Sequence, residues 1–108
     1  MADFSSINVG DALPSKSLSV DQTFVNEYAD ICGDYNTLHV DVEGMKDHPL
    51  FGGTIAHGFL TLSLLSHFAE TAGCGFEDMV MGINYGFDKV RFLVTFMFPT
   101  TKLSIVFT

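Results

Sequence analysis

Two short stretches decide the fold of this chain: GDYNTLH at residues 33–39 and FGGTIAHG at residues 51–58. The apolar run FLTLSLLSHF, residues 59–68, follows the second stretch directly. This run is apolar around nearly the whole circumference of a helix, so we expect a buried helix from Thr54 or Ala56 to about Thr71. A helix buried on all sides needs a sheet wrapped around it. The sequence therefore predicts an α+β fold in which strands cover a central helix.

Capping residues mark a second helix nearer the N-terminus. Asp21 is a typical N-cap residue, and Gly33 can adopt the left-handed conformation that often ends a helix, which predicts a helix from residue 21 to about residue 31. Residues 34–53 then read as a loop with a short helical turn near residues 42–46. A loop of this length inside a small domain is often functional.

Alternating apolar residues predict the strands. We expect a weak strand over residues 16–20 and further strands from residue 80 onward. Every second residue is apolar from Ile83 to Phe87, then, after a step at Asp88 and Lys89, from Phe92 to Phe98, and once more from Leu103 to Phe107. These strands would supply the sheet around the central helix.

Composition narrows the functional classes. With 108 residues the chain is long enough for a single domain over residues 1–108. The net charge of −8, with only five basic residues, argues against nucleic-acid binding. No run of about 18 apolar residues suggests a membrane span. The N-terminus does not look like a signal peptide, and Cys32 and Cys74 form no paired motif, so we expect a cytoplasmic protein.

The candidate chemistry lies in the turn that follows Gly33. Asp34 and His39 are five residues apart across a tight turn, so a carboxylate and an imidazole can face the same space, while Asn36 can hold the turn. Proton transfer needs such a pair within reach of one substrate. Taken singly, these residue types more often only stabilise turns.

His57 and Gly58 begin the apolar helix. Backbone N–H groups in the first turn of a helix have no intrahelical partner and can stabilise a developing oxyanion. Gly58 has no side chain to block the approach of a carbonyl group, although it could equally serve close helix–sheet packing. No histidine or cysteine spacing matches a local metal-binding pattern, so no metal is expected.

Residues 28–41, YADICGDYNTLHVD, followed by FGGTIAHG, resemble the MaoC-like hydratases, the (R)-specific enoyl-CoA hydratase family. The later GINYGFDKVRF, residues 82–92, is similar to the NodN-like branch of that family. Thr37 stands where the family usually has proline. The resemblance implies a hot-dog fold, in which an antiparallel sheet curls around a long central helix.

The resemblance also implies an activity: the reversible hydration of a trans-2-enoyl-CoA to an (R)-3-hydroxyacyl-CoA, a lyase reaction of fatty acid metabolism that needs no cofactor. Asp34 and His39 fall on the family's catalytic positions, Gly58 on its oxyanion amide and Ser66 on a helix serine that supports the site. Asn36 and His57 belong to the same motifs. The implied partners are an acyl-CoA or acyl carrier protein thioester and a second copy of the chain in a homodimer.

Residues 94–108 depart from the family pattern, so we expect a sheet that is incomplete at its C-terminal strands. Two other functions stay open on the sequence. One is a non-catalytic remnant that binds acyl thioesters or dimerises, and the other, less favoured, is a hot-dog thioesterase.

Overall fold

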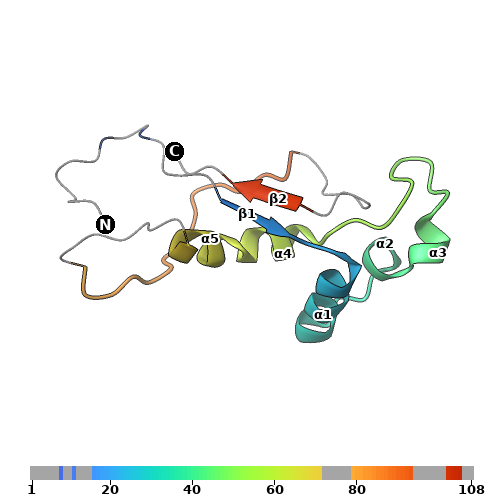
Figure 1. Ribbon diagram of the computed structural model, residues 1–108, viewed down its shortest axis with the longest axis horizontal. Helices are drawn as coiled ribbons and strands as arrows, with labels where there is room; N and C mark the ends of the chain where they lie inside the picture. Colours follow the sequence, from blue (N-terminus) through green and yellow to red (C-terminus); the bar gives the residue numbers. More distant parts are fainter. Residues whose placement is uncertain (1–7, 9–10, 12–15, 72–78, 94–101, 106–108) are drawn as a thin grey trace.

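The computed structural model describes residues 8, 11, 16–71, 79–93 and 102–105 of the chain. Within them lie two strands and five helices, which Figure 1 shows in order along the chain. They are β1 (Lys16–Ser19), α1 (Gln22–Cys32), α2 (Thr37–Val40), α3 (Val42–Met45), α4 (Gly58–Ser63), α5 (Leu65–Thr71) and β2 (Lys102–Ile105).

The sheet is short. Strand β1 pairs with β2 in antiparallel register, with Leu18 opposite Leu103 and Ser17 opposite Ser104. The weak strand expected over residues 16–20 is thereby confirmed, and so is a strand within residues 103–107, although the part of that prediction beyond Ile105 lies outside the described residues. Among the described residues the sheet has only these two strands.

Helix α1 has the predicted boundaries because its caps act as expected. The Asp21 side chain accepts a hydrogen bond from the Phe24 N–H, and Gly33 at the other end has a φ of 79° while its N–H donates to the Ala29 carbonyl. At this φ a residue with a side chain would be strained. Helix α1 therefore stops at Gly33, and the chain turns sharply into Asp34.

The loop expected over residues 34–53 contains two short helices. Helix α3 confirms the helical turn expected near residues 42–46, and its N-cap Asp41 accepts from the Gly44 N–H. Helix α2 was not predicted. It forms because the Asn36 side chain caps it, accepting from the Leu38 N–H at 3.0 Å.

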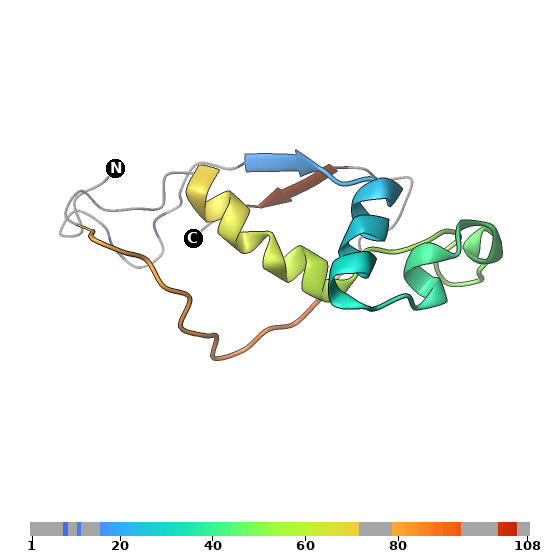
Figure 2. The same ribbon diagram turned by 90° about the horizontal axis from the view of Figure 1, so that it is seen from below.

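The central helix is interrupted and starts later than predicted, at Gly58. Helices α4 and α5 follow one another along nearly one line, with a break at Leu64 (Figure 2). The Ser63 hydroxyl donates to the Leu60 carbonyl at 2.7 Å, while the Leu64 N–H is shared between the carbonyls of Leu60 and Thr61. Such side-chain competition loosens and bends helices. The sequence also predicts a glycine cap at Gly73, which lies outside the described residues.

The core lies between the sheet and the α4–α5 helix. Its buried members are Val20 after β1, Val25 on α1, and Ala56, Leu60, Leu64 and Phe68 on and just before the helix. In Figure 2 the two strands lie on one side of α4 and α5, and helix α1 packs at the end where α4 begins. The apolar helix is therefore covered by the sheet on one side, as the sequence predicts.

Residues 79–93 differ from the prediction. They run along the side of the helix opposite the strands (Figure 2), but no strand is assigned within them. Their apolar side chains are exposed, with Val80 98 % and Leu93 85 % accessible. Alternation alone does not make a strand, because a strand needs a neighbour for its N–H and C=O groups, and no described residue pairs with this segment.

Among the helices that the structure describes, none combines the length and the apolar character that crossing a bilayer requires.

Candidate active site

Asp34 is held by the turn that follows α1. One carboxylate oxygen, Oδ1, accepts a hydrogen bond from the Asn36 N–H at 3.2 Å. Local bonds of this kind are typical of Asp and Asn in turns. The other oxygen, Oδ2, lies 3.9 Å from His39 Nε2, and the Asp34 side chain is 53 % exposed. One oxygen is therefore occupied by the backbone while the other faces an imidazole.

His39 is fixed from the side opposite Asp34. Its Nδ1 lies 2.8 Å from the Ile55 carbonyl oxygen, and the Ile55 N–H donates to the Leu38 carbonyl at 2.9 Å. A carbonyl oxygen can only accept, so His39 Nδ1 carries a proton and donates it. This leaves Nε2, the nitrogen nearest Asp34, free to exchange protons. The His39 side chain is only 12 % exposed.

Gln22 ties this arrangement to the start of α1. Its amide nitrogen donates to the His39 carbonyl at 2.7 Å, and its amide oxygen accepts from the Thr54 hydroxyl at 2.5 Å. Thr54 is buried. Gln22 thus joins the segment that carries His39 to the segment that leads into α4. Sequence reasoning missed it because its partners lie 17 and 32 residues away.

His57 is buried directly before α4. Its Nε2 lies 3.0 Å from the Asp34 carbonyl oxygen, so this nitrogen carries a proton and donates it. Its ring stacks on that of His39 with centroids 3.9 Å apart, and the Tyr28 ring meets it edge-on at 5.0 Å. The second ring nitrogen, Nδ1, is buried and has no hydrogen-bond partner among the described residues.

Gly58 is the first residue of α4, where the backbone N–H has no intrahelical acceptor. The Phe92 ring lies against it: a Cβ added at Gly58 would come within 3.0 Å of Phe92 Cε2. The absence of a side chain therefore lets an aromatic ring approach the beginning of the helix. Phe92 also meets Phe59 edge-on, with centroids 6.4 Å apart.

These groups enclose a cavity of about 220 Å³. Its lining residues are Tyr28, Cys32, Asp34, His39, His57, Gly58 and Phe59. Four of the residues named from the sequence, Asp34, His39, His57 and Gly58, therefore meet in one place. Asn36 is not among the lining residues. Its side chain instead caps α2 beside the cavity.

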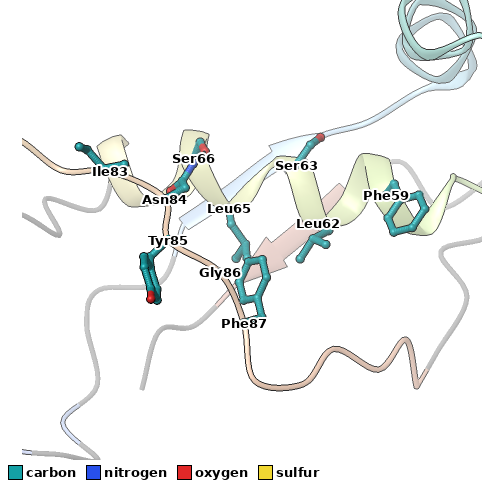
Figure 3. A pocket seen from close by; sticks show the side chains of 10 residues that line it. All are labelled: Phe59, Leu62, Ser63, Leu65, Ser66, Ile83, Asn84, Tyr85, Gly86 and Phe87. Carbon is teal, nitrogen blue, oxygen red and sulfur yellow. Dashed lines mark hydrogen bonds between the residues drawn. The ribbon is translucent and has the colours of Figure 1, made fainter.

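Ser66 lies apart from these groups. It lines a second cavity of about 490 Å³ between the α4–α5 helix and residues 83–87 (Figure 3). Its hydroxyl accepts a hydrogen bond from the Asn84 side chain at 3.4 Å. Phe59 borders both cavities, so the second cavity, lined mainly by apolar side chains, adjoins the polar one.

Three lining residues were not singled out as functional from the sequence: Phe59 on α4, and the pair Tyr28 and Cys32. Tyr28 and Cys32 are four residues apart on α1 and so lie on the same face of its last turns, directly before Asp34. This spacing in the sequence could have indicated that both side chains face the same site as Asp34. Burial raises the pKa of the Tyr28 phenol above its usual value, and the nearby Cys32 and Asp34 raise it further. Tyr28 therefore presents a neutral hydroxyl.

Three side chains of this site have the donor atoms that a metal ion requires. Asp34, His39 and His57 each offer one ligand atom, and the three atoms lie within 4.8 Å of one another. The sequence did not suggest a metal site, because the residues are 5 and 18 positions apart in the chain and match no local template. Only the approach of α2 to the start of α4 brings them together.

The site can move protons beside a carbonyl group. It combines a carboxylate oxygen and an imidazole nitrogen 3.9 Å apart with a helix-start N–H, in a cavity closed partly by aromatic rings.

Known proteins resemble this chain in sequence and in fold. A family model described as "MaoC like domain" matches residues 6–104. Nodulation protein N of Rhizobium meliloti is 46 % identical over 94 residues, which cover 86 % of this chain and 58 % of that protein. The 3-hydroxyacyl-thioester dehydratase Z of Mycobacterium tuberculosis is 44 % identical over 78 residues, covering 69 % and 48 %. The chain spans about half the length of these relatives.

The X-ray structure of the monoamine oxidase regulatory protein from Archaeoglobus fulgius superimposes with a TM-score of 0.76 at 26 % identity, covering 97 % of this chain and 68 % of that one. This similarity confirms the expected hot-dog fold, with a sheet that is short in the described residues. The relative named nodulation protein N agrees with the resemblance of residues 82–92 to the NodN-like branch. By its family match over residues 6–104, the chain belongs to the MaoC-like dehydratase family.

Proposed function

We propose that this protein catalyses the reversible hydration of a trans-2-enoyl thioester to an (R)-3-hydroxyacyl thioester. The observation that carries the proposal is the meeting of Asp34, His39 and Gly58 in one cavity. The relative named 3-hydroxyacyl-thioester dehydratase supports the same reaction class.

In the hydration direction, Asp34 Oδ2 takes a proton from water as the water oxygen attacks the β-carbon. The electron pair of the double bond moves toward the thioester carbonyl, and the developing enolate oxygen accepts a hydrogen bond from the Gly58 N–H. His39, protonated on both nitrogens, then gives the Nε2 proton to the α-carbon. Its Nδ1–H remains bonded to the Ile55 carbonyl throughout, which keeps the ring in place.

The cycle closes when the proton on Asp34 Oδ2 passes to His39 Nε2. These atoms are 3.9 Å apart, too far for a direct hydrogen bond but close enough for one bridging hydroxyl or water. No atom is gained or lost except the water that is added. Dehydration follows the same steps in reverse.

The acyl chain needs an apolar site beside the reacting carbons. The 490 Å³ cavity along α4 and α5 adjoins the polar one at Phe59, and its size lies within the range of small-molecule sites. We assign it to the acyl chain. Ser66, which was expected to support the catalytic site, then contacts the chain rather than the reacting carbonyl group.

Hydration of crotonyl-CoA, followed as loss of the enoyl absorbance, tests the proposal. We expect the protein to turn over crotonyl-CoA. Chiral chromatography should show that the product is the (R)-3-hydroxyacyl thioester. Release of free thiol instead would identify a thioesterase. Binding of the thioester without turnover would identify the non-catalytic alternative, in which the site residues are kept but not oriented for catalysis.

We also propose that two copies associate. The exposed apolar side chains of residues 79–93, and backbone groups that pair with no strand among the residues the structure describes, favour burial against another chain. Light scattering should report a mass of two chains or more. A stable monomer across the working concentration range would contradict this.

A further inference from the structure

The hydrogen bonds of the two stacked histidines leave one free nitrogen on each ring. His39 gives its Nδ1 proton to the Ile55 carbonyl, and His57 gives its Nε2 proton to the Asp34 carbonyl. The nitrogens with available lone pairs in the neutral rings are therefore His39 Nε2 and His57 Nδ1. Histidines that bind metals usually donate their other N–H to a backbone carbonyl or a carboxylate in this way.

His57 Nδ1 takes no part in the proposed hydratase mechanism. It is buried, and among the described residues it has no hydrogen-bond partner, although the side chain is only 3 % exposed. A buried acceptor without a partner costs free energy, and native structures generally satisfy such groups with protein, water or a bound ion. His57 also lines the polar cavity, but its Nδ1 atom is itself buried, so an ion reaches this nitrogen only after neighbouring side chains move aside.

Asp34 supplies an anionic oxygen to the same space. Its Oδ1 is bonded to the Asn36 N–H, while Oδ2 points toward His39 Nε2 at 3.9 Å. A tetrahedral ion with bonds of about 2.1 Å separates its ligand atoms by roughly 3.4 Å. The half-exposed Asp34 side chain can rotate to close this gap, and the His57 ring has to tilt out of its stacked position so that both imidazole lone pairs point at one ion. One ligand atom each from Asp34, His39 and His57 already lies within 4.8 Å of the others.

We propose that Asp34, His39 and His57 form a binding site for a divalent transition-metal ion of the Zn²⁺ class. Two imidazoles and one carboxylate suit Zn²⁺, Co²⁺ or Ni²⁺, whereas Mg²⁺ and Ca²⁺ prefer oxygen ligands alone. The ion binds in the cavity and takes the two groups that the proposed reaction needs for proton transfer. It therefore acts as an inhibitor that competes with the thioester. This inhibition rests on the proposed hydratase function, but metal binding itself does not.

Titration of the chelator-treated protein with Co²⁺, read by its visible absorption, tests the site directly. We expect saturation at one ion per chain, with band intensities of four- or five-coordinate Co²⁺, and displacement by Zn²⁺ but not by Mg²⁺. Asp34→Asn and His39→Ala should each weaken binding by roughly tenfold or more. Both residues lie near the surface or in a short helix, so these variants should fold, which circular dichroism can verify.

Two matched controls separate this site from others. His67→Asn removes an exposed histidine outside the cavity and should leave Co²⁺ affinity unchanged. Cys32→Ser, which changes a thiol lining the same cavity, should also leave it unchanged, because Cys32 is not in the ligand set. Lack of saturable binding, or equal affinity in wild type, Asp34→Asn and His39→Ala, would overturn the site.

The activity measurement distinguishes this inference from the proposed function. If the protein hydrates crotonyl-CoA, Zn²⁺ should raise its apparent KM in the wild type, and excess chelator should reverse the effect. Saturable Co²⁺ binding in a protein without hydratase activity would sustain the metal site and refute the enzyme. Turnover unaffected by Zn²⁺ at concentrations that saturate the Co²⁺ site would refute the competition.

Discussion

The His57 ring donates its Nε2 proton to the main-chain carbonyl of Asp34 at 3.0 Å, which joins the residue after the cap of α1 to the residue before α4. The Asp34 side chain meanwhile faces His39, whose ring stacks on that of His57. Two elements separated by 23 residues are thus locked together by one buried imidazole. The position of the carboxylate relative to the α4 N-terminus depends on this bond.

Asp34→Asn and His39→Ala should abolish most hydratase turnover while leaving the fold intact. General acid–base groups typically contribute a factor of about 10²–10⁴ in rate, so we expect kcat/KM for crotonyl-CoA to fall by that order. Asp88→Asn and His67→Asn change exposed residues outside the cavity and serve as controls. Normal rates in either cavity variant, with unchanged circular dichroism, would refute the assignment.

Gln22→Ala should lower both stability and activity. The variant removes the bonds to the His39 carbonyl and to the buried Thr54 hydroxyl, and an unsatisfied buried polar group costs about 1–3 kcal/mol. Urea denaturation should show a loss of that order, and kcat should fall as His39 loses its support. Asn26→Ala is the matched control, because it removes only the exposed bond to the same Gln22 amide. Equal effects of the two variants would contradict a positioning role for Gln22.

Gly58→Ala should reduce turnover more than stability. The added methyl group would come within 3.0 Å of Phe92 Cε2, so the half-exposed ring has to move away from the start of α4. Alanine is a better helix former than glycine, which offsets part of the packing cost. We expect kcat/KM to fall about tenfold or more as an oxyanion donor is crowded.

The double variant Gly58→Ala with Phe92→Ala separates steric crowding by the ring from crowding by the methyl group itself. If the ring is responsible, the double variant recovers part of the loss caused by Gly58→Ala. The single variant Phe92→Ala is measured as well. If the relative activity of the double variant equals the product of the relative activities of Gly58→Ala and Phe92→Ala, the two residues act independently. That result would argue against the contact between Phe92 and Gly58 as the cause.

Lys89→Glu and Arg91→Glu should raise KM for coenzyme A thioesters with little change in kcat. Only five basic residues oppose thirteen acidic ones, and these two come just before Phe92, which lies against Gly58. Exposed charge pairs are individually weak and screened by salt, so we expect a roughly three- to tenfold rise that shrinks at high ionic strength. Lys46→Glu, an exposed lysine at the end of α3, is the control. Equal KM values in all three variants would show that the phosphate groups of coenzyme A contact other residues.

Local signals were sufficient for much of this structure. Asp21 and Gly33 bound α1 as predicted because capping depends only on neighbouring backbone groups. The family motifs likewise pointed to Asp34, His39, His57 and Gly58, which line one cavity. The helix break at Leu64 has a local cause, the hydrogen bond from the Ser63 hydroxyl to the Leu60 carbonyl. Helix propensities alone do not predict whether this side-chain bond interrupts the helix.

What the sequence by itself determined was the position of the caps, the apolar run that must be buried and the family to which the chain belongs. Only the tertiary structure decided that residues 79–93 lie beside the helix without a strand partner in the described part of the chain, and that Ser66 faces a separate cavity. It also decided that His57 retains a buried nitrogen without a partner among the described residues. Periodicity reports which side chains prefer to be buried, whereas pairing and ring orientation depend on groups far away in the chain, whose distances no local pattern contains.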